Sequence, residues 1–209
     1  MRFVLFLFLA LTSNAPRANA ADTPSKTGKD AAAEYFKEQK RTPAATNTVG
    51  GEHYLGIHIG NHLSSTAYRW GPQKREKGVA KFSGGLTYRF GEWVNFGDSY
   101  LRVDFSSYEF ASGNRATKMS VLAAVLLPDI SSQFPFYFGA GIGPGVFFKQ
   151  LEGESALSLD YQLLLGLRFL NLIDSVGFFV ETGLQNHIHI LSDGQLNSSY
   201  LIGGVLFSF

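Results

Sequence analysis

The sequence contains no cysteine among its 209 residues, and its charges are few and balanced. Without cysteine the chain can form no disulfide, no thiolate metal site and no thiol nucleophile. Lys and Arg number 18 against 17 Asp and Glu, so the basic field that nucleic-acid binding requires is absent. The mean hydropathy of +0.02 is too low for a helical membrane protein, but it fits a chain whose side chains alternate between an apolar and a polar face.

The first twenty residues have the pattern of a cleaved secretory signal. Arg2 precedes the apolar run from Phe3 to Leu11, and residues 18–20 read Ala-Asn-Ala, an A-x-A cleavage site. This apolar run is too short to cross about 30 Å of hydrocarbon as a helix. We therefore expect residues 1–20 to be removed and the mature chain to begin at Ala21, with no transmembrane helix after it.

Residues 21–52 differ in composition from the rest of the chain, being rich in Ala, Lys, Thr and Glu. Good helix formers at 30–41 predict a short helix that Pro43 ends. Two interpretations stay open, namely a flexible periplasmic tail with a transient helix, or an amphipathic helix that lies on a membrane or plugs a pore. Gly50 and Gly51 mark the boundary with the next region.

From residue 53 onward, apolar side chains recur at every second position, which is the period of a β-strand. Between 176 and 190, for example, the even positions are mostly apolar and the odd positions are polar or small. The alternation becomes uncertain after Ser106, where we expect a β-bulge. The predicted strands are 53–69, 80–90, 101–106, 117–128, 136–148, 157–169, 176–190 and 196–209.

Eight strands are the smallest number found in bacterial outer-membrane barrels. One face of these strands combines glycines with charged residues, as a narrow barrel interior requires, and the other is apolar with aromatic residues at the strand ends. A soluble β-sandwich or a lipocalin-like barrel also alternates and is the alternative. We predict an all-β protein, an eight-stranded antiparallel up-and-down transmembrane β-barrel over residues 53–209.

The polar face predicts a network of salt bridges and hydrogen bonds inside the barrel. Eight-stranded barrels are filled by side chains, and buried charges need partners. We therefore expect a closed lumen without metal or cofactor; a narrow passive pore, or a metal site at the four histidines, are the alternatives. The expected interior residues are His58, His62, Lys81, Arg89, Arg102, Asp104, Asp160, Arg168, Glu181, Gln185, His187 and His189.

The chain resembles the small Gram-negative outer-membrane barrels of the OmpA/OmpX-like superfamily over residues 53–209. The resemblance rests on the motif YFGAGIGPG at 137–145 and on the last strand, YLIGGVLFSF, in which Leu201, Val205, Phe207 and Phe209 alternate. It implies that the barrel-assembly machinery reads this last strand and that periplasmic chaperones act during biogenesis. It also implies a periplasmic N-terminus, with the connections near 71–78, 111–116, 151–156 and 191–195 facing outward.

The expected function is a structural or interaction role in the cell envelope, as a monomer without catalysis. Its expected surroundings are outer-membrane lipid and lipopolysaccharide. Lys74, Arg75 and Lys77 in the first outer loop are candidate contacts for lipopolysaccharide phosphates, the alternative being an ordinary solvated loop.

A lipid A deacylase is the enzymatic alternative, because residues 186–194 (NHIHILSDG) resemble a late strand of that family. The deacylase pattern is His-x-Ser with a downstream carboxylate, so that the His activates the Ser hydroxyl. Here His189 stands at the Ser position, and no Glu follows Gly194. Ser192 lies three residues beyond His189, which is the wrong spacing for one face of a strand.

Overall fold

The computed structural model describes residues 53–94, 97–132 and 134–209. The expected signal peptide at 1–20, the tail at 21–52 and its helix at 30–41 lie outside these residues. Within them the strands are β1 (Tyr54–Tyr68), β2 (Arg75–Lys77), β3 (Ala80–Val94), β4 (Gly97–Glu109), β5 (Arg115–Leu127), β6 (Phe136–Lys149), β7 (Leu157–Ile173), β8 (Val176–His189) and β9 (Gln195–Ser208), with a 3-10 turn, η1, at Ile130–Ser132.

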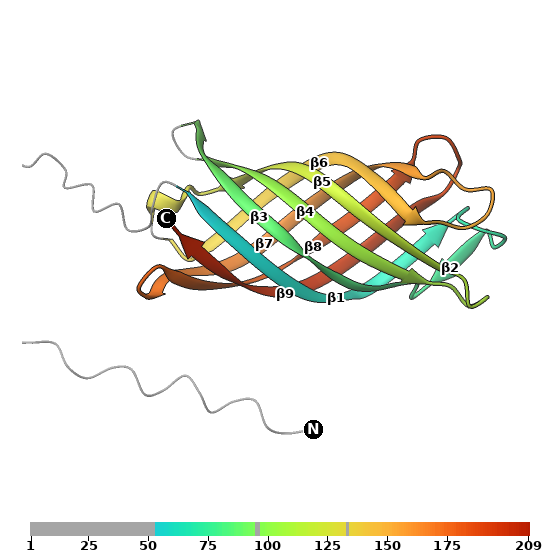
Figure 1. Ribbon diagram of the computed structural model, residues 1–209, viewed down its shortest axis with the longest axis horizontal. Helices are drawn as coiled ribbons and strands as arrows, with labels where there is room; N and C mark the ends of the chain where they lie inside the picture. The colour runs from blue at the N-terminus through green and yellow to red at the C-terminus, as the bar shows by residue number, and fades with distance from the viewer. Residues whose placement is uncertain (1–52, 95–96, 133) are drawn as a thin grey trace, which may run out of the picture. The chain divides into compact units, whose positions relative to one another are not determined.

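The described strands form one antiparallel sheet that closes on itself (Figure 1). The long strands pair in chain order, and β1 pairs with β9 from Tyr54 to Tyr68, which completes an eight-stranded barrel. The predicted fold class is therefore confirmed. The strand prediction missed β2, a short ninth strand that pairs, among the described strands, with the end of β1.

The strands of the barrel run obliquely to its axis (Figure 1). The strands are staggered around the barrel. The backbone pairing that starts at Asn197 on β9 passes through β8, β7, β6, β5, β4, β3 and β1. It returns to β9 at Phe207, a displacement of ten residues. Such a stagger requires tilted strands, and with eight of them it leaves an interior that side chains can fill.

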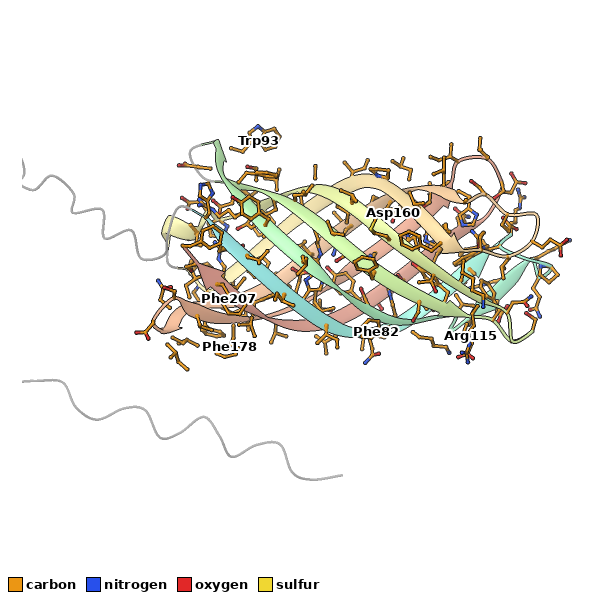
Figure 2. All side chains as sticks on the ribbon, in the orientation of Figure 1. Phe82, Trp93, Arg115, Asp160, Phe178 and Phe207 are labelled. Atoms are coloured by element: carbon orange, nitrogen blue, oxygen red, sulfur yellow. The ribbon has the colours of Figure 1, made fainter. Side chains whose placement is uncertain are left out.

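The outward face is apolar over most of its area. Exposed aromatic side chains gather at the end of the barrel where His53 and Phe209, the first and last described residues, pair through their backbones. Figure 2 shows Trp93, Phe178 and Phe207 at this end. The exposed aromatic residues here are Phe90, Trp93, Phe134, Phe136, Phe138, Phe169, Phe178, Phe207 and Phe209. We call this the terminal end and the opposite one the loop end.

The bulge expected after Ser106 lies instead in the neighbouring strand. Along β4 the alternation continues without a break, because Ser106 and Tyr108 are both buried. In β3 the register shifts between Ala80 and Ser83, which are buried, so two residues stand outward opposite Ser107. One of them is Lys81, which is exposed. The prediction of Lys81 as an interior residue is therefore wrong, because a bulge reverses the alternation.

Among the described residues there is no helix with the length and apolar character that crossing a membrane requires.

Candidate functional site

Ion pairs occupy the middle of the barrel interior. Arg102 on β4 lies between two carboxylates, with Nε 3.0 Å from Asp104 Oδ1 and Nη1 2.6 Å from Glu181 Oε1. His58 Nε2 lies 2.8 Å from the same oxygen of Asp104. All four side chains are almost completely buried. Because an unpaired buried charge is costly, each carboxylate depends on Arg102.

Tyrosines from two other strands complete the shell around Glu181. Tyr200 donates to Glu181 Oε1 at 2.7 Å, and Tyr137 donates to Oε2 at 3.1 Å. The Tyr137 ring lies against Gly166 on β7, where a Cβ atom would be only 2.4 Å from the ring. Gly166 therefore has to be a glycine for the Tyr137 hydroxyl to reach Glu181.

A second group of ion pairs lies at the terminal end. Arg89 Nη2 is 2.6 Å from Asp98 Oδ1, and Arg168 Nη1 is 3.7 Å from Asp98 Oδ2. Arg168 also donates to the backbone carbonyls of Pro128 and Asp129, both at 2.7 Å. The amide of Ile130 donates to Asp98 Oδ2 at 2.8 Å. This group therefore ties the turn before β6 to the inside of the barrel.

The third group lies toward the loop end and centres on Asp160. Lys118 Nζ is 2.7 Å from Asp160 Oδ2 and 3.1 Å from His187 Nδ1. Ser158 donates to Asp160 Oδ1 at 2.6 Å, and Ser120 donates to Oδ2. Every one of these side chains is buried, so Lys118 is the cation that balances Asp160.

Above Lys118, aromatic rings close the loop end of the barrel. Trp70, only 1% exposed, stands edge-on to Tyr108 and His187 with centroids 4.9 Å away, and to His189 at 5.2 Å. Its Nε1 donates to Gln150 Oε1 at 3.0 Å. We call Trp70 and the buried residues packed with it the outer plug; its apolar members are Ala67, Trp70, Val79, Ala80, Tyr108, Phe110, Ala116, Phe147, Leu151 and Leu196.

Glu154 joins three loops over the outer plug. Its Oε1 accepts the amide of Gly71 at 2.9 Å, and its Oε2 accepts the hydroxyl of Ser192 at 2.7 Å. His189 Nδ1 lies 3.0 Å from Ser192 Oγ and 3.3 Å from Glu154 Oε2. One carboxylate thus connects the loops after β1, β6 and β8.

Replacing Glu154 by Ala should loosen these loops while leaving the barrel intact. The amide of Gly71 and the hydroxyl of Ser192 both lose their acceptor, and we expect backbone amides in 69–74 and 190–194 to exchange hydrogen faster. Hydrogen exchange measured by mass spectrometry would test this, with Glu109→Ala as the control because Glu109 forms an exposed ion pair with Arg115 and joins no loops within the described part of the chain. Equal exchange in both variants would contradict the role of Glu154.

The interior contains a small cavity among the described residues. A cavity of about 20 Å³ lies between the central and terminal groups and is lined in part by Tyr100, Arg102, Arg168 and Glu181. That volume holds about one water molecule.

Several solved structures are similar to this chain. The crystal structure of Neisserial surface protein A (NspA) has a TM-score of 0.50 and 18% sequence identity, covering 77% of this chain and 99% of that one. The chain has the fold of the small eight-stranded outer-membrane barrels. The outer membrane enzyme PagL (TM-score 0.46, 14% identity, 75% and 99% covered) and Ail of Yersinia pestis (0.43, 18%, 76% and 100%) are also similar. No family model matches the sequence, and no curated protein does.

In this outer-membrane-type barrel, all the expected interior residues except Lys81 point inward. The structure distributes them over the three groups and the outer plug rather than gathering them at one point. His62 lies beside Tyr108, with ring centroids 6.4 Å apart. Gln185 is buried as well. Leu201, Val205, Phe207 and Phe209 of the last strand stand outward, and Lys74, Arg75 and Lys77 are exposed at the loop end.

Several partners in the network were missed by sequence reasoning. Asp98 belongs to a turn-like sequence, Phe-Gly-Asp-Ser, although it is completely buried as the first inward side chain of β4. Lys118 and Ser120 occupy the even-numbered positions of their strand, which form its inward face, so the alternation could have identified them as interior residues. Trp70 and Glu154 lie in loops, where no periodicity applies.

Ser192 is the residue whose surroundings differ most from expectation. The chain turns back after β8, so the Ser192 hydroxyl lies beside His189, three residues earlier. The nearby carboxylate belongs to Glu154, in the loop after β6. The spacing argument against such proximity was wrong, because it assumed that the strand continues. In a catalytic triad, however, one ring nitrogen faces the serine and the other faces the acid.

Here His189 Nδ1 faces both Ser192 and Glu154. The other ring nitrogen, Nε2, is buried and has no hydrogen-bond partner among the described residues. Ser192 Oγ also accepts the amide of Ser155 at 3.2 Å. The Ser192 hydroxyl is thus bonded to the loop after β6, through Glu154 and Ser155, and to His189 at the end of β8. We call this arrangement, which ties the two loops together, the loop clasp. Within the described part of the chain, no three His, Asp or Glu side chains are placed to hold a metal ion.

Proposed function

We propose that this protein is an outer-membrane barrel with a structural and interaction role, whose lumen is closed by its own side chains. The observation that carries the proposal is the filled interior, in which three groups of ion pairs and the outer plug succeed one another along the axis. A conducting lumen would need a continuous aqueous path, and an eight-stranded barrel with large buried side chains offers little room for one.

The distribution of charge supports an orientation with the loop end outward. Among the described residues, the exposed Lys and Arg side chains all lie at the loop end, whereas exposed carboxylates lie at both ends: Glu109, Glu152 and Asp193 at the loop end, Glu92 and Asp174 at the terminal end. Figure 2 shows Arg115 at the loop end, opposite Trp93. The exposed cations are Arg69, Lys74, Arg75, Lys77, Lys81, Arg115 and Lys149.

Cations at that end fit a leaflet whose lipids carry phosphate groups. Lys74, Arg75 and Lys77 then stand where lipopolysaccharide phosphates would be. Arg75 already lies over the ring of Tyr68, 5.3 Å from its centroid, which holds this part of β2 against β1. The role is proposed as non-catalytic because the Ser192 hydroxyl is engaged by the loop clasp.

Planar-bilayer recording of the folded protein tests the closed lumen, and we expect flat traces without stable conductance steps. Unitary steps of constant size would instead establish a narrow pore. Membrane fractionation, together with a gel comparison of boiled and unboiled samples, tests the location and the barrel. We expect the protein in the outer-membrane fraction with heat-dependent migration, and recovery in the soluble periplasm would refute the proposal.

A further inference from the structure

Part of the outward face is polar where a lipid-facing surface should be apolar. Asn61 and Ser64 on β1, and Asn197 and Ser199 on β9, all point outward. Ser64 is paired with Ser199 in the β1–β9 ladder, and Asn61 is paired with Leu201 two residues further along, so these side chains are neighbours. We call these four residues the polar patch.

Lys81 borders the polar patch on the next strand. Asn61 pairs with Phe82 of β3, and Lys81 precedes Phe82 in the bulge, where both side chains stand outward. Lys81 Nζ donates to the carbonyl of Gly78 at 2.8 Å, and among the described residues it forms no ion pair. An ammonium group has three protons, so Lys81 retains donors for an external anion.

The polar patch lies on the side of the barrel away from β6 and β7. On those two strands the outward side chains stay apolar or aromatic up to the loop end, where Phe148 is 65% exposed and Leu157 is exposed as well. On β8, which adjoins β9, Asn186 also points outward and is paired with Asn197 of the patch. The apolar surface therefore extends closer to the loop end on β6 and β7 than it does at the patch.

An apolar groove of about 810 Å³ lies directly below the patch, on the same strands. The groove is hollow here because both residues paired with Ile59 of β1 are glycines, which have no side chains: Gly84 on β3 and Gly203 on β9. Phe82 stands at one end of the groove, and Phe178 and Phe207 stand at the other (Figure 2). Polar and cationic groups thus lie above a groove that only apolar groups can fill.

We propose that the polar patch, Lys81 and the groove together bind one phosphorylated glycolipid of the lipid A type. Its phosphate pairs with Lys81, its sugar hydroxyls bond to the Asn and Ser side chains, and one acyl chain lies in the groove. The proposal rests on the proposed function, since it requires the loop end to face the leaflet that holds this lipid.

Protein occupants fit the surface less well. Between Leu55 and Asn61, β1 is paired on both sides, by β3 and by β9, so it offers no free edge to an added strand. A symmetric dimer through this face would bring together two patches that contain Lys81 and no carboxylate.

The test is a native mass spectrometry titration of the full, detergent-folded chain with hexa-acylated lipid A, and with phosphatidylglycerol as the second probe. Gly203→Leu should fill the groove, because a Cβ atom at this position meets nothing closer than the Phe179 carbonyl at 3.8 Å. Lys81→Glu should repel the phosphate. We expect each variant to weaken lipid A binding by about tenfold or more.

The controls place comparable changes outside the proposed site. Ala140→Leu adds an apolar side chain to an exposed position of β6, and Glu92→Lys reverses an exposed charge of β3 at the terminal end. Both should bind lipid A as the wild type does. Equal weakening by site and control variants, or equal binding of phosphatidylglycerol, would overturn the inference. Loss of heat-dependent migration and of outer-membrane location would instead count against the proposed function.

Discussion

Replacing Arg102 by methionine should lower the free energy of unfolding by about 3–5 kcal/mol, the loss typical of removing one partner from a buried ion pair. Methionine approximates the length of the side chain but leaves Asp104 and Glu181 without their cation. Both carboxylates are buried, so water cannot replace Arg102. Urea unfolding in lipid vesicles, followed by tryptophan fluorescence, measures the change.

Arg115→Met is the matched control, because Arg115 forms an ion pair with Glu109 at 3.0 Å with side chains 67% and 45% exposed. Exposed pairs contribute about 1 kcal/mol or less. If Arg102→Met cost no more than Arg115→Met, the central ion pairs would not be holding the barrel together.

Replacing Trp70 by alanine should also cost about 3–5 kcal/mol, as truncation of a large buried aromatic residue does. The ring fills the space between Tyr108, Phe147 and the two stacked histidines, His187 and His189. Gln150 loses one donor but still accepts the amide of Leu151 at 2.8 Å, so the cost arises mainly from the cavity. Circular dichroism during urea unfolding is the suitable measurement, since the fluorophore is removed.

The chain has only one other tryptophan, Trp93, which is 66% exposed at the terminal end. Trp93→Ala should cost clearly less than Trp70→Ala, because Trp93 is mostly exposed and its truncation leaves no buried cavity. A similar loss in both variants would show that burial in the outer plug contributes nothing particular to stability.

The strands could be predicted from the sequence because alternation depends only on which face of a strand is apolar. For β8 this sufficed, since it keeps its phase from end to end, and β6 keeps its phase as far as Phe148. The prediction failed for Lys81, because a bulge adds one residue to a strand and no characteristic amino-acid composition reveals it. The sequence Ala-Lys-Phe-Ser at 80–83 is compatible with either phase, and the break was assigned to the wrong strand.

The polar interior could be predicted residue by residue, but its pairing could not. Alternation shows that Arg102 and Glu181 both face inward, and it says nothing about which carboxylate lies opposite which cation. The contacts of Glu154 with Gly71 and Ser192 join loops that are far apart in the chain, and only the closed barrel brings them together.

The central ion pairs also bear on how the barrel assembles. Arg102 lies on β4 and Glu181 lies on β8, and the two residues are separated by 79 positions in the chain. Because several strands lie between them in the sheet, they meet across the lumen, and a flat intermediate leaves Glu181 without this cation. The last pairing, between β1 and β9, therefore brings Glu181 to Arg102, so closing the sheet and forming this buried ion pair are coupled events.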